Sequence, residues 1–158
     1  MGVEIERKFL VHKAKWEQLQ KPVGKLFRQG YISTDAAKTV RVRTGDGKGY
    51  LTLKGANVGL TRLEFEYEIP IADAEQLLKN FCSNSISKTR YEIWLEGKLW
   101  EVDVFHDANE RLLIAEIELA IEDESFALPD WIEKELSEDE RYYNSNLSLL
   151  PYKNRGAS

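Results

Sequence analysis

The chain has 158 residues, of which 42% are hydrophobic and 31% are charged, and its formal net charge is −5. This length predicts a single domain over residues 1–152, followed by a flexible polar tail over 153–158. The acidic balance argues against a general nucleic-acid or anionic-membrane surface, and no stretch approaches the roughly 18 apolar residues that span a bilayer. We therefore expect a cytoplasmic protein in which any anion-binding site is local.

Stretches in which apolar and charged residues alternate follow one another along the chain. Such period-two alternation is typical of β-strands that present two different faces. The predicted strands span 3–11, 26–33, 38–44, 48–54, 61–69, 86–95, 98–106 and 111–121. Glycine-containing turns at 45–47 and 96–97 favour tight hairpins, so neighbouring strands should run antiparallel.

Helical patterns are expected between and after these strands, over 14–19, 72–81 and 130–136. The run from Ser137 to Glu140 has the form of a capping box and predicts the start of another short helix. One face of the predicted sheet is almost wholly apolar and must be covered. The amphipathic helices are the only cover that the sequence predicts for it.

The opposite face of the predicted strands is charged, and its charges are separated by sign. Arg41 and Arg43 share one strand, whereas Glu116 and Glu118 share another. Solvated faces usually mix the two signs, because like-charged neighbours repel one another. Eight antiparallel strands are enough to close into a barrel that holds one small ligand. We therefore expect a mainly β, α+β fold, in which a closed eight-stranded antiparallel barrel turns its charged face inward.

A tunnel with an acidic wall and a basic wall is costly to leave without ligands, because each buried charge loses its hydration. Carboxylates without nearby thiolates or paired histidines select hard cations, which favours Mg²⁺ or Mn²⁺ over zinc. Arginine and lysine match the geometry of phosphate groups. No phosphate-cradling loop and no Ser-His-Asp set is present, so we expect metal-assisted phosphoryl or nucleotidyl transfer.

A family resemblance is carried by short runs that occur in order across nearly the whole chain. The run Glu4-Ile5-Glu6-Arg7-Lys8 resembles the amino-terminal ExExK signature of the CYTH superfamily, the triphosphate tunnel metalloenzymes. Further matching runs are 28–31, 41–43, 51–54, 64–69, 88–91, 101–105, 116–119 and 141–144. The resemblance implies a closed eight-stranded tunnel with covering helices and a carboxyl-terminal plug helix.

The resemblance also implies roles for individual residues. Lys8 is expected beside the reacting phosphate as a catalytic residue, with Tyr31 as its helper. The residues expected to bind the triphosphate are Arg41, Arg43, Lys54, Lys88 and Arg90. The residues expected to bind the metal are Glu4, Glu6, Glu116 and Glu118, with Asp103 and Glu66 as further candidates.

The segment 129–136 resembles the plug helix of the family, although Glu133 stands where glycine is common. The sequence leaves open whether Lys134, next to it, points into the tunnel or into solvent. A plug at this place would close one end of the predicted barrel.

The small bacterial members that this chain resembles hydrolyse tripolyphosphate. The expected activity is therefore metal-dependent hydrolysis of inorganic tripolyphosphate to pyrophosphate and phosphate, with one divalent ion neutralising the phosphates and a second orienting the attacking water. The alternatives are a class IV adenylyl cyclase, a thiamine or nucleoside triphosphatase, and a non-catalytic polyphosphate-binding module. The expected partner is a small molecule that bears a triphosphate; no nucleic acid or membrane is expected, and a homodimer is left open.

Overall fold

A computed structural model describes residues 2–149 and 151–152, and the predicted tail 153–158 lies outside this range. The strands are β1 (Val3–Val11), β2 (Lys25–Ser33), β3 (Thr39–Gly45), β4 (Lys48–Lys54), β5 (Thr61–Ile69), β6 (Ser85–Leu95), β7 (Lys98–Phe105), β8 (Leu113–Glu118) and β9 (Ile132–Glu135). The helices are α1 (Lys13–Gln18), α2 (Ile71–Asn80) and α3 (Asn144–Leu149), with single 3₁₀ turns η1 (Asp107–Asn109) and η2 (Glu140–Tyr142). Within the described part of the chain, every helix is too short or too polar to cross a membrane.

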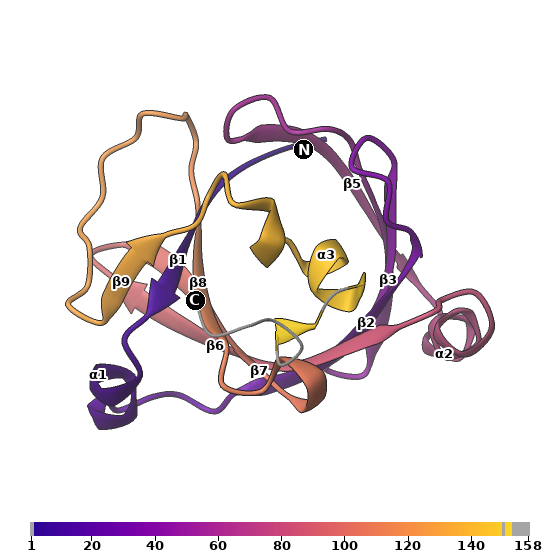
Figure 1. The fold of residues 1–158 in the computed structure, drawn as a ribbon, viewed down its shortest axis with the longest axis horizontal. Coiled ribbons are helices and arrows are strands. Elements are labelled where there is room, and N and C mark those ends of the chain that lie inside the picture. Colours follow the sequence, from indigo (N-terminus) through magenta and orange to yellow (C-terminus); the bar gives the residue numbers. More distant parts are fainter. Residues whose placement is uncertain (1, 150, 153–158) are drawn as a thin grey trace.

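Strands β1 to β8 form a closed antiparallel barrel (Figure 1). Around the ring the order is β5, β4, β3, β2, β6, β7, β8 and β1, and pairing of β1 with β5 closes it. In that closing pair, Val3 lies opposite Leu63 and Ile5 opposite Thr61. The predicted eight-stranded barrel is confirmed. The predicted strand boundaries agree within one residue except at β8, which is shorter at both ends.

The register of the strands brings charged residues together on the inner face of the barrel. In the pairing of β1 with β8, Glu6 lies opposite Glu118 and Lys8 opposite Glu116. Because side chains directly opposite each other lie on the same face of a sheet, these four side chains share the interior. The charged residues of the alternating sequence pattern therefore line the tunnel.

The outer, apolar face of the barrel is covered only in part by helices. On one side, α1 contributes the buried Trp16, which packs with Trp100 of β7 and Trp131. The irregular segment between β8 and β9 adds Phe126, whose ring meets that of Trp100 edge-on at 5.7 Å. The expectation that amphipathic helices are the only cover is therefore wrong, because this segment and β9 also shield the barrel.

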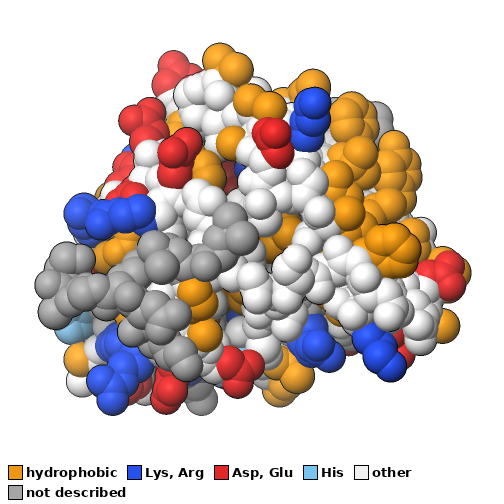
Figure 2. Space-filling view, turned by 45° about the vertical axis from the view of Figure 1, so that its right-hand side comes forward, with side chains coloured by type: hydrophobic (Ala, Val, Ile, Leu, Met, Phe, Trp, Pro, Cys, Tyr) orange, Lys and Arg blue, Asp and Glu red, His pale blue; other side chains and the backbone are white. Residues whose placement is uncertain are grey.

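On the opposite side, α2 packs across β3 and β4, where it buries Ala74 and Leu78 against Val42. The outer face of the neighbouring strand β5 has no such cover. Its residues Leu63, Phe65 and Tyr67 are each roughly half exposed. Figure 2 shows hydrophobic side chains gathered along this flank of the molecule.

The helix predicted over 130–136 is wrong, since this segment contains the strand β9. Strand β5 pairs with β1 only over Val3–Ile5, so the later part of the same edge of β1 is open. Strand β9 fills it, with Ile132 opposite Val11. Backbone groups on an open edge need hydrogen-bond partners, and this need outweighs a local helical pattern. Lys134 is exposed on β9 and does not enter the tunnel.

The capping box predicted at Ser137 is also wrong. The Oγ of Ser137 accepts a hydrogen bond from the backbone N–H of Lys8 at 3.0 Å, which ties this residue to β1. It is Asp139 that caps η2, by accepting a hydrogen bond from the N–H of Arg141 at 3.2 Å. From there η2 and α3 enter the ring of strands (Figure 1). The segment that plugs the tunnel is therefore Glu140–Leu149, not 129–136; we call it the plug.

Replacing Gly49 of β4 with alanine should lower the free energy of unfolding by about 1–3 kcal/mol, because a methyl group there overpacks a close contact. A Cβ on Gly49 would lie 2.7 Å from the Cβ of Ala74 in α2 and 3.1 Å from the carbonyl oxygen of Ile69. Urea denaturation would measure the change. In a double-mutant cycle, Ala74→Gly should recover part of the loss; purely additive effects would contradict this account of the packing.

Candidate active site

A polar cavity of about 180 Å³ occupies the interior of the barrel. Residues from seven of the eight barrel strands and one residue of the plug line it, and nearly all of them are charged. The lining residues are Glu4, Glu6, Lys8, Arg41, Arg43, Lys54, Glu64, Glu66, Lys88, Arg90, Glu101, Glu116, Glu118 and Asn144. The structure therefore brings together every site residue predicted from the sequence except Tyr31 and Asp103, which lie next to this cavity.

The acidic wall is formed by β1 and β8. Glu4 and Glu6 project from β1, and Glu116 and Glu118 from β8. Burial raises the pKa of Glu6 to about 8, and the nearby carboxylates of Glu116 and Glu4 add to this effect. Burial first, and then its acidic neighbours, therefore disfavour the charged form of Glu6. A cation bound among these residues would remove that penalty.

Lys8 reaches into the acidic wall from the same strand. Its Nζ lies 3.7 Å from a carboxylate oxygen of Glu6 and 3.7 Å from one of Glu116. Burial alone would lower the pKa of Lys8, but Glu116 and Glu6 outweigh it and raise the pKa above its usual value. Burial alone would likewise raise the pKa of Glu116, whereas Lys8 and Arg90 hold it well below its usual range. Lys8 is thus a stable cation with no short hydrogen bond to either carboxylate.

The basic wall begins at β3, which carries Arg41 and Arg43. Both guanidinium groups contact the same carboxylate oxygen of Glu66, at 3.3 and 3.5 Å. The hydroxyl of Thr52 donates to this oxygen at 3.0 Å. Burial, together with the neighbouring Arg41 and Arg90, lowers the pKa of Arg43 to about 10. Two arginines that share one carboxylate keep most of their donor capacity for an anion.

On β6, Lys88 and Arg90 share the buried carboxylate of Asp103. The Nζ of Lys88 lies 2.7 Å from Asp103, and Arg90 donates two hydrogen bonds to it, at 2.8 and 2.9 Å. Burial would raise the pKa of Asp103, but the two cations hold it below its usual value. Burial also lowers the pKa of Lys88 to about 8, although Asp103 favours its charged form.

These contacts place the two further metal candidates against the basic wall. Asp103 is fully buried and forms ion pairs with Lys88 and Arg90. Glu66 forms ion pairs with Arg41 and Arg43. Lys54 faces the other way, toward the acidic wall, at 3.2 Å from Glu4. Asp103 and Glu66 therefore act in this structure as partners of the cations that are expected to bind phosphate.

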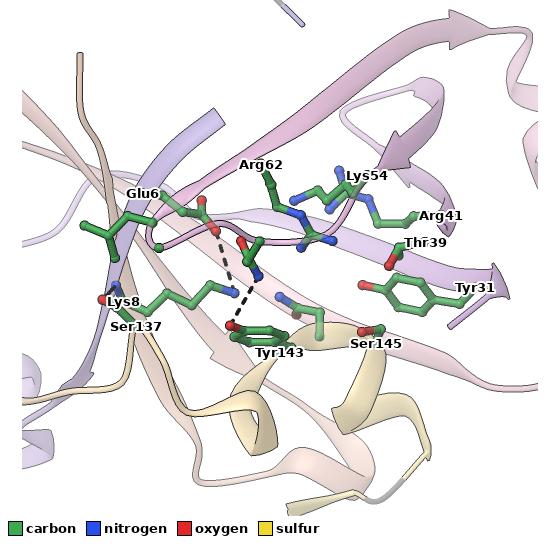
Figure 3. Close-up of a pocket in the computed structure, with 14 residues that line it drawn as sticks. Glu6, Lys8, Tyr31, Thr39, Arg41, Lys54, Arg62, Ser137, Tyr143 and Ser145 are labelled. Carbon is green, nitrogen blue, oxygen red and sulfur yellow. Dashed lines mark hydrogen bonds and ion pairs between the residues drawn. The ribbon is translucent and has the colours of Figure 1, made fainter. Parts of the chain in front are cut away.

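A second chamber lies between the cavity and the plug, and we call it the plug-side chamber (Figure 3). It shares Glu6, Lys8, Arg41, Lys54 and Asn144 with the cavity described above. The additional lining residues are Tyr31, Thr39, Asn57, Gly59, Leu60, Arg62, Ser137, Tyr143 and Ser145. Tyr31 is therefore in the same chamber as Lys8, as the predicted pair requires.

Sequence reasoning missed several residues of this chamber. Arg62 belongs to the charged face of β5, and its position in the alternation was the available signal. Tyr143 and Asn144 lie in a run that resembles the family, but their place inside the barrel depends on the path of the plug. The Lys8 ammonium lies 5.4 Å from the centre of the Tyr143 ring, and the amide of Asn57 donates to the Tyr143 hydroxyl at 3.2 Å.

The acidic wall suits a hard divalent cation by its chemistry, because it offers only carboxylate oxygens. The carboxylates also crowd one another, since Glu116 and Glu4 add to the effect of burial in raising the pKa of Glu6. In the described part of the chain, no three acidic, histidine or cysteine side chains already converge on one point as ligands. Glu4 and Glu116 face lysines instead. The donor set fits the metal, and binding would require these ion pairs to rearrange.

Comparison with known proteins agrees with this geometry. The model of the CYTH domain matches residues 2–151. An inorganic triphosphatase of Acetivibrio thermocellus is 52% identical over 155 residues, which span 98% of this chain and 98% of the relative. An inorganic triphosphatase of Nitrosomonas europaea is 36% identical over 92% of this chain and 97% of the relative. The solved structure of an inorganic triphosphatase matches with a TM-score of 0.65 at 33% identity, covering 92% of this chain and 94% of that chain. The chain therefore belongs to the CYTH domain family.

Proposed function

We propose that this protein hydrolyses inorganic tripolyphosphate to pyrophosphate and phosphate in a reaction that depends on a divalent metal. The observation that carries the proposal is the facing arrangement of an acidic and a basic wall in one cavity. A metal-complexed phosphate chain satisfies both walls at once, since phosphate oxygens bind both guanidinium groups and divalent metal ions. The names of the two relatives, both called inorganic triphosphatases, support the same activity.

The basic wall would bind and orient the phosphate chain. Arg41 and Arg43 supply planar guanidinium groups from β3, and Arg90 supplies another from β6. These groups are already fixed by Glu66 and Asp103, so they lose little freedom when the chain binds. Electrostatic stabilisation by such fixed donors lowers the barrier as charge moves to the leaving oxygen.

Lys8 is the residue best placed to serve that leaving oxygen. Its ammonium stays charged because of Glu6 and Glu116, yet both carboxylates lie at the long distance of 3.7 Å. Its protons are therefore available for a hydrogen bond to substrate. Tyr31 lines the same chamber and can donate a further hydrogen bond from its hydroxyl.

The metal, which we expect to be Mg²⁺ or Mn²⁺, would be held by Glu4, Glu6, Glu116 and Glu118. When bound, a divalent cation supplies charge neutralisation of the phosphates and activation of the attacking water. Specific recognition of tripolyphosphate is part of the same proposal. The cytoplasmic location remains a prediction from the sequence, which leaves the oligomeric state open.

Purified protein should release phosphate and pyrophosphate in equal amounts from tripolyphosphate when Mg²⁺ or Mn²⁺ is present, and chelation by EDTA should abolish the release. Lys8→Ala and Glu6→Ala should each reduce kcat at least about 100-fold, because each removes a group at the reacting centre. Lys134→Ala, which alters an exposed lysine on β9, is the matched control and should retain full activity.

The same assay, extended to ATP and thiamine triphosphate with each metal, separates the alternatives. Formation of cyclic AMP from ATP would identify a cyclase. Metal-dependent binding of tripolyphosphate without any turnover would identify a binding module. Unchanged turnover in Lys8→Ala or Glu6→Ala would contradict the site assignment.

A further inference from the structure

Arg62 differs from the other cations that line the tunnel. Each of the others lies within ion-pair distance of a carboxylate; they are Lys8, Arg41, Arg43, Lys54, Lys88 and Arg90. The Nε of Arg62 donates a hydrogen bond to the backbone oxygen of Gly55 at 2.9 Å. Among the residues that the structure describes, no carboxylate forms an ion pair with its guanidinium group, which lines the plug-side chamber.

The position of Arg62 follows from its strand and its neighbours. It is the inward-facing residue of β5 nearest the plug, and it lies opposite Glu4 in the pairing with β1. The hydrogen bond to Gly55 fixes the Nε edge of the guanidinium, so its two remaining nitrogen atoms are available to the chamber (Figure 3). A half-buried positive charge without a carboxylate partner attracts an anion.

The rest of the chamber is rich in neutral hydrogen-bond donors. The hydroxyl of Tyr143 accepts a hydrogen bond from Asn57, so its own proton remains available to a ligand. The hydroxyl of Tyr31 accepts one from Gln29 at 2.9 Å and is available in the same way. Asn144 and Ser145 add further neutral groups, whereas the hydroxyl protons of Thr39 and Ser137 are already donated to Asp35 and Glu135. Glu6 is the chamber's single carboxylate among the described residues.

The two ends of the tunnel are lined by different groups. Glu66 and Glu118 line the cavity away from the plug, and both are exposed. Beside the plug, Tyr31 and Thr39 are buried, while Asn57 and Gly59 of the same chamber are exposed. A phosphate chain that enters at the end lined by Glu66 and Glu118 would meet the plug-side chamber last, with its terminal phosphate group.

We propose that the plug-side chamber is a phosphate-binding subsite that works without a metal ion, with Arg62 as its principal ligand. The guanidinium group of Arg62 and the hydroxyls of Tyr31 and Tyr143 bind one tetrahedral phosphate group. This proposal rests on the proposed function, because the group it binds is the terminal phosphate of the substrate or the orthophosphate that hydrolysis releases. Arg62 is thus a substrate-binding residue outside the set predicted from the sequence.

The direct test is titration calorimetry of inorganic phosphate into the protein in the presence of EDTA, without any metal or turnover. Wild-type protein should bind one phosphate, and Arg62→Gln should weaken this binding at least about tenfold, as expected for a lost hydrogen bond between charged groups. Arg28→Gln is the matched control, since Arg28 is exposed and lies outside the tunnel lining, and it should bind like wild type. Arg62→Lys should retain part of the affinity.

Steady-state kinetics with tripolyphosphate and Mg²⁺ separate the two sources of the phosphate group. If the subsite holds the terminal phosphate of the substrate, Arg62→Gln should raise KM about tenfold and leave kcat within about twofold. If it holds released orthophosphate, the inhibition constant for phosphate should rise about tenfold with KM unchanged. Either pattern supports the subsite.

The proposal is overturned if wild-type protein binds no phosphate in EDTA, or if Arg62→Gln binds it as tightly as wild type. Should Arg62→Gln fail to fold, Tyr143→Phe provides the second variant, which should weaken phosphate binding several-fold; unchanged affinity would then contradict the subsite. If wild-type protein does not hydrolyse tripolyphosphate, the proposed function is refuted. The metal-free titration still tests the subsite in that case, because it requires no turnover.

Discussion

Replacing Glu116 with glutamine is expected to reduce kcat for tripolyphosphate hydrolysis at least about 100-fold. Glu116 combines two roles in this site. It is a proposed metal ligand, and it stabilises the charge of Lys8 from 3.7 Å away. Even outer partners of metal ligands are worth about 10–100-fold, so a direct ligand should exceed that range.

Phosphate release at saturating tripolyphosphate and metal would measure this effect. Glu110→Gln is the matched control, because Glu110 is exposed and lies outside the tunnel lining. Raising the Mg²⁺ concentration should recover part of the lost activity if the substitution mainly weakens metal binding. If the variant keeps activity within about threefold of wild type at low Mg²⁺, Glu116 neither binds the metal nor stabilises the charge of Lys8.

Replacing Asp103 with asparagine should lower the free energy of unfolding by about 3–5 kcal/mol, which is the cost of leaving buried charges without their partner. The substitution keeps the shape of the side chain but removes the negative charge between Lys88 and Arg90. Lys88 is fully buried and would lose its carboxylate partner, while Arg90, which is half-buried on the same strand, would keep only Glu101.

Urea denaturation in metal-free buffer would measure the loss of stability. Asp123→Asn changes an exposed aspartate outside the barrel strands, and its effect should stay within about 0.5 kcal/mol. A loss below about 1 kcal/mol for Asp103→Asn would show that Lys88 can release its proton at little cost. That outcome would agree with a pKa of about 8 for Lys88, and it would show that Glu101 suffices as the partner of Arg90.

The sequence was sufficient to predict which side chains share the tunnel, because strand geometry fixes the face of every second residue. The boundaries of β1 were enough to place Glu4, Glu6 and Lys8 on the inner face of the barrel. Those of β3 did the same for Arg41 and Arg43. Closure into a ring could be inferred from the number of strands and from the family resemblance. The pairing of β1 with β5, which produces it, is a long-range contact that no local pattern encodes.

The prediction failed where distant parts of the chain compete for the same partner. Residues 130–136 carry a helical pattern, yet the open edge of β1 draws them into β9. Ser137 is the first residue of an apparent capping box, yet its hydroxyl accepts a hydrogen bond from the backbone N–H of Lys8. Tyr143 reaches the site only because the chain turns back into the barrel after β9. Arg62 was overlooked because its significance lies in the absence of a carboxylate beside it, which only the assembled walls reveal.

The position of β1 in the ring has a consequence for how the protein is made. Strand β1 is the first to leave the ribosome, but its neighbours in the barrel are β5 and β8, and β8 ends at Glu118. The ring cannot close until Glu118, the last residue of β8, has been synthesised, and the plug enters later still. Native contacts of such large sequence separation slow folding. The ability to bind a phosphate chain therefore arises only after β8 and the plug have been synthesised.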